Sequence, residues 1–112
     1  CLYPQRKNLS ENIKVISIIG HFLEHSRIFW FCNNGDNEVF IGSADWMRRN
    51  LDRRIEAVTP IEDYELKSKI YSLLQTYIKD DYFSWIMKDD GSYSKYKLDS
   101  SDNRSQIDLI EK

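Results

Sequence analysis

The chain is 112 residues long, and its hydrophobic content of 41% and charged content of 30% are typical of one soluble globular domain. Its net charge of −2 at pH 7 argues against a nucleic-acid partner, because a general nucleic-acid-binding surface needs a basic domain. The longest apolar runs, at 15–19 and 28–32, are too short to span a membrane and lack the flanks of a signal peptide. Two cysteines, Cys1 and Cys32, suggest no disulfide framework, so we expect a reducing, cytoplasmic setting.

The first half of the chain predicts strands. Its β-branched and aromatic residues indicate four of them, at 13–19, 27–33, 38–42 and 53–58. The Asn-Gly pair within 33–37 predicts a hairpin between the second and third strands, since Asn-Gly suits positions with positive φ. Gly20 interrupts the pattern, so 20–24 is expected to form a short helical turn. Residues 1–12 are expected to be loop, and 44–51 a turn or a short helix.

The second half begins with a helix. Residues 61–79 carry apolar side chains at the helical period, with acidic residues at the start and a lysine at the end. A hairpin is expected at 82–96 and a weak terminal helix at 105–112. We therefore expect an α/β domain at 1–97, with a mixed sheet and packed helices, followed by a polar, mobile tail at 98–112.

Candidate chemistry starts at His25, just before the second strand. An imidazole can donate or accept a proton near neutral pH, or attack phosphorus directly. Arg27 lies two residues further on, so on an extended chain it points to the same side and offers a planar fork to phosphate oxygens. Taken alone, a His-x-Arg pair is more often an ordinary surface pair.

Small residues follow the third strand. In the sequence Gly42-Ser43-Ala44-Asp45, backbone N–H groups and a hydroxyl can approach a bound anion. Because the hairpin makes the second and third strands antiparallel, His25 and Ser43 are expected at the same edge of the sheet. A plain hairpin with a glycine at its exit is the alternative interpretation.

Arg53, Arg54 and Glu56 complete the candidate site. If 53–58 is a strand, Arg54 and Glu56 share a face. A carboxylate beside His25 would fix the tautomer of the imidazole and support the positive charge that it gains. The alternatives are a solvated face for the arginines and a surface ion pair of little energy for Glu56.

The chain shows no other established motif. His21 lies four residues before His25, but no second pair of metal ligands follows, so we predict no metal site within the chain. No P-loop, nucleophile elbow or dinucleotide fingerprint is present in the sequence.

Four blocks of sequence, taken together and in order, resemble the C-terminal domain of bacterial polyphosphate kinase, the type that synthesises long chains. They are Ser10-Glu-Asn-Ile13, Phe22-Leu-Glu-His-Ser-Arg27, Ser43-Ala-Asp-Trp-Met47 and Asn50-Leu-Asp-Arg-Arg-Ile-Glu56. The resemblance runs from about residue 1 to residue 96. A looser resemblance, to the histidine motif of the phospholipase D superfamily, has Arg27 in place of Lys and Asp45 in place of Asn.

The resemblance implies a phospholipase D-like fold and reversible transfer of the γ-phosphoryl of ATP to polyphosphate. In that family two such domains face each other across a tunnel, and the histidine that becomes phosphorylated lies in the domain before this one. His25 then matches the second family histidine, which contacts nucleotide phosphate and assists transfer as acid or base, and Glu56 matches a carboxylate paired to it. The residues expected to bind substrate or nucleotide phosphate are His25, Arg27, Ser43, Asp45, Arg53 and Arg54.

The chain would thus be the nucleotide-side half of a kinase active site. ATP or ADP is the implied substrate, Mg²⁺ ligands are expected in an upstream domain, and the full-length enzyme is expected to be a homo-oligomer. The chain opens on Cys1 rather than Met, so we expect a piece of a longer enzyme, folded through its own core but inactive alone. Tyr3, Gln5 and His21 depart from residues common in the family. The alternative is an autonomous phosphate- or polyanion-binding module without turnover, in which no second histidine domain precedes Cys1.

Overall fold

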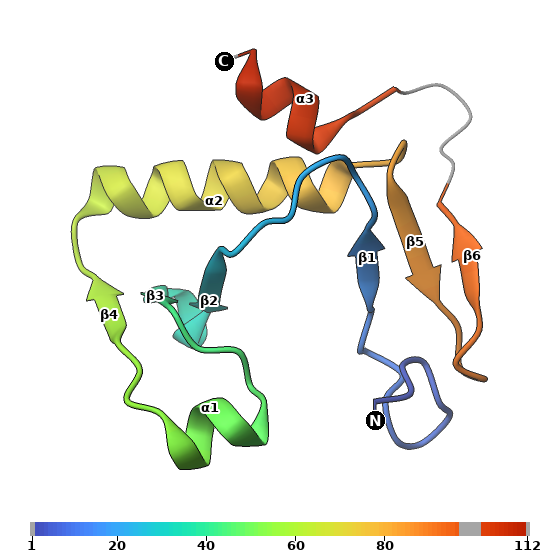
Figure 1. Cartoon of the computed structure of the whole chain (residues 1–112), viewed down its shortest axis with the longest axis horizontal. Coiled ribbons are helices and arrows are strands. Elements are labelled where there is room, and N and C mark those ends of the chain that lie inside the picture. The colour runs from blue at the N-terminus through green and yellow to red at the C-terminus, as the bar shows by residue number, and fades with distance from the viewer. Residues whose placement is uncertain (1, 97–101, 112) are drawn as a thin grey trace. The chain divides into compact units, whose positions relative to one another are not determined.

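The computed structural model describes residues 2–96 and 102–111 of the chain. The chain divides into two compact units, one formed by Cys1–Phe22 and Leu73–Lys112 and the other by Leu23–Ser72. Helices and strands are interspersed along the sequence (Figure 1), which confirms the α/β class. The described strands form two separate three-stranded sheets with antiparallel pairings, rather than one mixed sheet.

The unit Leu23–Ser72 is built on the sheet β2-β3-β4. Its strands are β2 (Arg27–Phe31), β3 (Glu38–Gly42) and β4 (Val58–Ile61). A short 3-10 helix, η1 (Asn33–Gly35), joins β2 to β3, and all three of its residues have positive φ. The predicted hairpin is therefore confirmed, and its asparagines and glycine supply the left-handed backbone that the turn requires.

The strand predicted at 53–58 is wrong in its position. Arg48–Arg53 forms the helix α1, and β4 begins only at Val58. Arg48 pairs with Asp52 one helical turn further on, a spacing that supports a helix. Pro60 lies within β4 instead of ending it, opposite Phe40. Proline is tolerated there because β4 is an edge strand among the described strands, where a missing N–H breaks no inner ladder.

The helix α2 (Tyr64–Lys79) confirms the long helix predicted from the apolar period, with a start a few residues later. Its first half packs on the sheet β2-β3-β4: the rings of Trp30 and Tyr71 lie 5.2 Å apart, and Lys67 Nζ donates to the carbonyl of Asn37 at 2.8 Å. Val39, paired with Trp30 in the register, is buried at the centre of this unit.

The other unit contains the sheet β1-β5-β6. Its strands are β1 (Ile16–Ile18), β5 (Ser84–Met87) and β6 (Tyr93–Lys95), so the predicted strand at 13–19 and the predicted hairpin at 82–96 are both present, with shorter strands. At the turn of that hairpin the hydroxyl and the N–H of Ser92 donate to Asp90, which lowers the pKa of its carboxyl below the ordinary 3.8. The segment 20–24 is irregular, with bends at 21 and 22 instead of the expected helical turn.

The C-terminal segment contains a helix in the part that the structure describes, and the mobility expected of 98–112 stays a prediction. Residues 97–101 and 112 lie outside the described residues. The helix α3 (Ser105–Ile110) confirms the expected terminal helix, and its first two residues, Ser105 and Gln106, are buried. Asp80, at the end of α2, accepts from both the N–H and the hydroxyl of Ser105, at 2.7 and 2.6 Å. Buried hydrogen bonds to a carboxylate thus fix α3 to its own unit.

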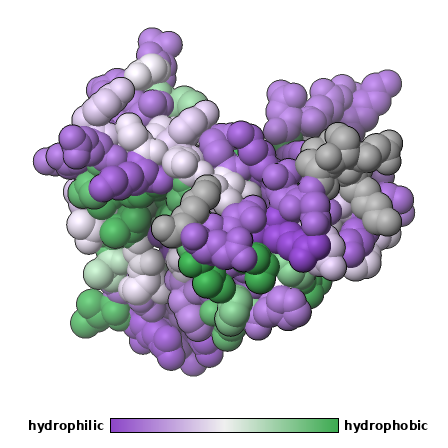
Figure 2. Space-filling model, turned by 90° about the horizontal axis from the view of Figure 1, so that it is seen from above, coloured by the Kyte–Doolittle hydropathy of each residue, from purple (hydrophilic) through white to green (hydrophobic). Residues whose placement is uncertain are grey.

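The apolar core is small. Among the described residues, Val39 and Ala44 are the buried hydrophobic ones, whereas many large apolar side chains are exposed. Green, hydrophobic side chains accordingly reach the surface in Figure 2. Apolar side chains line a groove of about 290 Å³ within Leu23–Ser72, and its residues are Phe29, Phe31, Phe40, Ala44, Trp46, Leu51 and Val58. The expectation of a self-contained core is therefore not met in the described residues. No helix among them is long and apolar enough to cross a membrane.

Candidate active site at one edge of the sheet β2-β3-β4

Antiparallel pairing brings three distant segments of the chain to one edge of the sheet β2-β3-β4. Arg27 opens β2, Gly42 closes β3 and Val58 opens β4, and the register places Arg27 opposite Gly42 and Gly42 opposite Val58. The residues just outside these ends are His25, Ser43 and Glu56. The expectation that His25 and Ser43 come to the same edge is confirmed by this register.

Ser43 and Glu56 are joined directly. The hydroxyl of Ser43 donates to Glu56 Oε2 at 2.6 Å, and the N–H of Ser43 donates to the carbonyl of Ala57 at 3.2 Å. Gly42 allows the two segments to approach, because a Cβ there would lie 3.1 Å from the carbonyl oxygen of Ala57. The carboxylate of Glu56 is thus held in one orientation at the edge of the sheet.

Arg27 is engaged on two sides. Its Nε and Nη2 lie 2.8 and 2.7 Å from Oδ1 of Asp45, and its Nη1 donates to the carbonyl oxygen of His25. Arg27 thereby connects the backbone of His25 to the segment that follows β3. The guanidinium is half-buried, so this geometry makes Arg27 a support for His25 more than a free cation.

The imidazole of His25 is exposed and makes no hydrogen bond or ion pair with another side chain in the described part of the chain. It is therefore accessible to a ligand, with its backbone fixed. Glu56 bonds to Ser43 rather than to this imidazole, so the pairing of His25 with Glu56 stays a prediction.

The helix α1 places positive charge after this edge. Arg48 is paired with Asp52 at 3.1 Å. Arg49, Arg53 and Arg54 are exposed, and none of them has a carboxylate partner within the described ranges. Arg53 ends α1 and Arg54 follows it in extended backbone, so Arg54 and Glu56 do not share a strand face as predicted. The guanidinium groups remain available to an anion.

The arrangement offers the kinds of chemical group that a phosphate-binding site uses. It combines an accessible imidazole, a fixed carboxylate and unpaired guanidinium groups, which suit electrostatic stabilisation and proton transfer. Among residues 2–96 and 102–111, no group of three His, Cys, Asp or Glu side chains could hold a metal ion.

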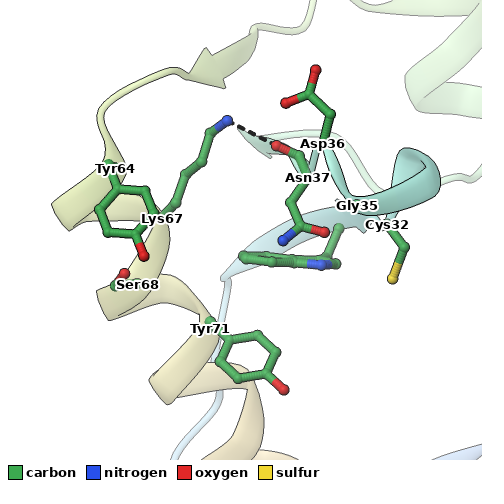
Figure 3. Close-up of a pocket in the computed structure, with 9 residues that line it drawn as sticks. Cys32, Gly35, Asp36, Asn37, Tyr64, Lys67, Ser68 and Tyr71 are labelled. Carbon is green, nitrogen blue, oxygen red and sulfur yellow. Dashed lines mark hydrogen bonds between the residues drawn. The ribbon is translucent and has the colours of Figure 1, made fainter.

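A second hollow, of about 530 Å³, lies at the η1 end of the same unit (Figure 3). Its lining residues are Trp30, Cys32, Gly35, Asp36, Asn37, Tyr64, Lys67, Ser68 and Tyr71. Lys67 is the one cation among them, and its amine already donates to the carbonyl of Asn37. Asp36 balances the charge of this single cation, so the hollow is poorly suited to a phosphate, and the sheet edge at His25 is the better candidate.

The chain resembles known proteins over nearly all of its length. Residues 1–106 match the family described as polyphosphate kinase C-terminal domain 2. A polyphosphate kinase of Parasynechococcus marenigrum is 59% identical over 111 residues, which cover 97% of this chain and 16% of that protein. A polyphosphate kinase of Pseudomonas aeruginosa is 44% identical over 114 residues, which cover 100% of this chain and 16% of that protein. The crystal structure of polyphosphate kinase from Porphyromonas gingivalis matches with a TM-score of 0.83 and 37% identity, over 91% of this chain and 16% of that one.

The architecture and these likenesses define an α/β domain, in agreement with the phospholipase D-like class expected from the sequence. The chain belongs to the polyphosphate kinase C-terminal domain 2 family. It spans 16% of the length of the relatives named above, so their activity concerns a larger protein than this chain.

Proposed function

We propose that this chain forms the nucleotide-side half of a polyphosphate kinase active site, which transfers the γ-phosphoryl of ATP reversibly to polyphosphate. The observation that carries the proposal is the convergence of His25, the Ser43–Glu56 pair and the Arg27–Asp45 pair at one sheet edge. Membership of the polyphosphate kinase family supports it.

Each residue has a distinct role in this proposal. His25 contacts nucleotide phosphate and assists the transfer as acid or base. Glu56, oriented by Ser43, supports the charge on His25. Arg27 and Asp45 fix the backbone of His25, and Arg53 and Arg54 neutralise the dense charge of the phosphates, as electrostatic catalysis of phosphoryl transfer requires.

In this proposal, the other groups that the reaction needs belong to the full-length protein. The bond between the γ-phosphorus and its bridging oxygen breaks, and a histidine upstream of this chain carries the phosphoryl group before polyphosphate accepts it. Mg²⁺ with its ligands, a cytoplasmic location and a homo-oligomeric assembly are likewise proposed for the full-length enzyme.

The test is His25→Ala in the full-length polyphosphate kinase that contains this chain, with His21→Ala as the matched control. The ring of His21 packs against Phe83, at 5.5 Å, and takes no part in the proposed site. We expect His25→Ala to lower the rate of polyphosphate synthesis by about 10²–10⁴-fold, the usual range for a general acid–base residue. His21→Ala should stay near the wild-type rate. Near-wild-type turnover by His25→Ala would remove His25 from the mechanism.

A further inference from the structure

The hollow at the η1 end of the unit Leu23–Ser72 lies between α2 and the turn that joins β2 to β3 (Figure 3). Four side chains line it from α2, namely Tyr64, Lys67, Ser68 and Tyr71. The last three follow Tyr64 by three, four and seven residues, and side chains at these spacings share one face of a helix. The turn lines the other side with residues from 32 to 37. Every lining residue lies between 30 and 71, so the hollow belongs to one compact unit.

Aromatic side chains line this hollow. Trp30 is half-buried, whereas Tyr64 is 82% and Tyr71 50% exposed, so the hollow is accessible from solvent. The rings of Trp30 and Tyr71 lie 5.2 Å apart and are inclined by 49°, so they are not stacked face to face on one another. Rings of this kind can stack with a planar heterocycle. The volume of about 530 Å³ is within the range of about 300–1,000 Å³ that is typical of small-molecule sites.

The turn contributes polar groups that are free to bind. Within residues 2–96 and 102–111, the carboxylate of Asp36 and the side-chain amide of Asn37 have no hydrogen-bond or ion-pair partner. The bond from Lys67, drawn as a dashed line in Figure 3, ends on the backbone carbonyl of Asn37 and leaves that amide free. An amide offers both a donor and an acceptor, whereas a carboxylate only accepts. A matching ligand therefore donates to Asp36 and pairs in both senses with Asn37.

The charges of the hollow cancel. Asp36 and Lys67 have opposite charge, and the described lining residues include no other charged side chain. A phosphate has little to gain here, because the carboxylate repels it as the amine attracts it. A neutral molecule with a planar ring and hydroxyl donors matches the hollow better, since its ring can stack and a hydroxyl can donate to Asp36. A nucleoside has both parts in one molecule.

We propose that this hollow binds an adenine nucleoside, either free or as part of a nucleotide. The base stacks against the rings of Trp30 and Tyr71. The amide of Asn37 pairs with the donor and the acceptor on one edge of the adenine, as asparagine does when it reads this base in nucleic acids. Asp36 accepts from a ribose hydroxyl, the contact by which a carboxylate recognises ribose in dinucleotide-binding proteins.

This site is separate from the candidate active site. His25 lies just before the start of β2, whereas the hollow lies at the other end of that strand, next to Phe31. From Arg27 to Phe31 the strand rises about 13 Å, at about 3.3 Å per residue. The inference therefore goes beyond the proposed function and does not rest on it, and the activity of His25→Ala has no bearing on it.

The experiment measures, by equilibrium dialysis, how many molecules of radiolabelled adenosine bind to the full-length polyphosphate kinase that contains this chain. In Ser68→Phe the added ring fills the hollow, so we expect this variant to bind one adenosine fewer per chain than the wild type. The matched control is Lys69→Phe, because Lys69 is the next residue of α2, is exposed and does not line the hollow. It should bind as many as the wild type. Equal numbers for the two variants would overturn the proposal.

Asp36→Asn tests the polar contact with little change in volume. Loss of the charged acceptor should raise the Kd of this site for adenosine by about 10-fold or more. The control is Glu38→Gln, an exposed residue near the turn that does not line the hollow, and its Kd should be that of the wild type. Both changes are at exposed positions, so this pair decides the question if Ser68→Phe does not fold. A Kd that is the same in both variants would contradict the proposal.

Competition identifies the class of ligand. Unlabelled adenosine and AMP should displace the adenosine that Ser68→Phe fails to bind, and the tighter of the two distinguishes a free nucleoside from a nucleotide. Inorganic triphosphate and glucose should not displace it. Displacement by triphosphate would indicate an anion site and displacement by glucose a sugar site, and either result would overturn the proposal. The KM for ATP should be unchanged in Ser68→Phe, whereas a raised KM would show that the hollow belongs to the substrate site.

Discussion

Arg27 is the residue on which the local geometry of His25 depends most directly. Its guanidinium joins Asp45 on one side to the carbonyl of His25 on the other. The sequence predicts a phosphate ligand at this position, which stays a prediction, and in the structure Arg27 is bonded to groups within the chain. A cation engaged in this way has fewer donors left for a substrate.

Asp45→Ala tests this supporting role. Without its carboxylate, Arg27 is free to leave the carbonyl of His25, so we expect kcat of the full-length enzyme to fall by about 10-fold or more. The stability should change by less than about 1 kcal/mol, because the pair is partly exposed. Asp52→Ala, which breaks the exposed pair with Arg48, is the matched control and should leave kcat unchanged. Indistinguishable kcat values for the two variants would contradict the supporting role.

Glu56→Gln separates charge from hydrogen bonding at the sheet edge. The amide can still accept from Ser43 but carries no charge, so we expect kcat to fall by about 10²-fold if the charge supports His25. Ser43→Ala keeps the charge and loses only its tether, and a smaller fall is expected. The measurement is kcat of the full-length enzyme for these two variants, with Glu62→Gln as an exposed control. A Glu56→Gln enzyme as active as Glu62→Gln excludes a role for the charge.

The position of a single residue could be predicted from the sequence only where the pairing of the strands determines it. The Asn-Gly turn fixed the pairing of β2 with β3, and this pairing brings His25 and Ser43 to one edge. The bond between Ser43 and Glu56 could not be found in this way, because it depends on where β4 begins. The hydrogen bonds of Gln106 to the backbone at 21–22 could not be predicted either, because they cross separations of 84 and 85 positions of sequence.

Among the helices and strands, the anchoring of α3 is the clearest addition to the sequence-based interpretation, which expects the helix itself. The polar segment after residue 97 offers no apolar period that predicts packing. Its anchoring comes from polar side chains, Ser105 and Gln106, that find buried partners far away in the sequence. Hydrophobic patterns cannot indicate such contacts, because they contain no information on side-chain hydrogen bonds.

Asp80→Asn tests this anchoring. An amide in place of the carboxylate presents an N–H₂ group where Ser105 or Phe83 donates, so at least one buried hydrogen bond is lost. We expect the free energy of local opening of α3 to fall by about 1–3 kcal/mol. Hydrogen exchange of the backbone amides at 105–110 measures this free energy. The control is Asp89→Asn, which changes an exposed residue in a turn. Equal exchange in both variants would show that the buried carboxylate does not anchor α3.

The error at 53–58 has a local cause. Alternation in so short a segment fits a strand, whereas the spacing of Arg48 and Asp52 fits a helix just before it, and the sequence alone does not decide between them. The long helix α2 was predictable because its apolar period persists over 16 residues.

Exposed apolar side chains are the dominant feature of the part of the chain that the structure describes. Val39 and Ala44 are the buried apolar side chains of the described residues, while Phe31, Trp46 and Leu51 line an exposed groove. A patch of this kind on a small chain is unusual for a monomer that acts alone.

The isolated chain of 112 residues should therefore be marginally stable. We expect it to bind a hydrophobic dye such as ANS strongly and to make no polyphosphate from ATP, because the proposed site is only half of an active site. Dye fluorescence and a polyphosphate assay measure these two properties, and the full-length enzyme is the control. Polyphosphate synthesis by the isolated chain would refute the half-site proposal.

His25 is proposed to assist phosphoryl transfer without itself being phosphorylated. The most direct measurement incubates the full-length enzyme with ATP labelled in its γ-phosphate and then locates the acid-labile label by peptide mapping. We predict label on a histidine outside residues 1–112 and none on the peptide that contains His25. Label on His25 would contradict the claim.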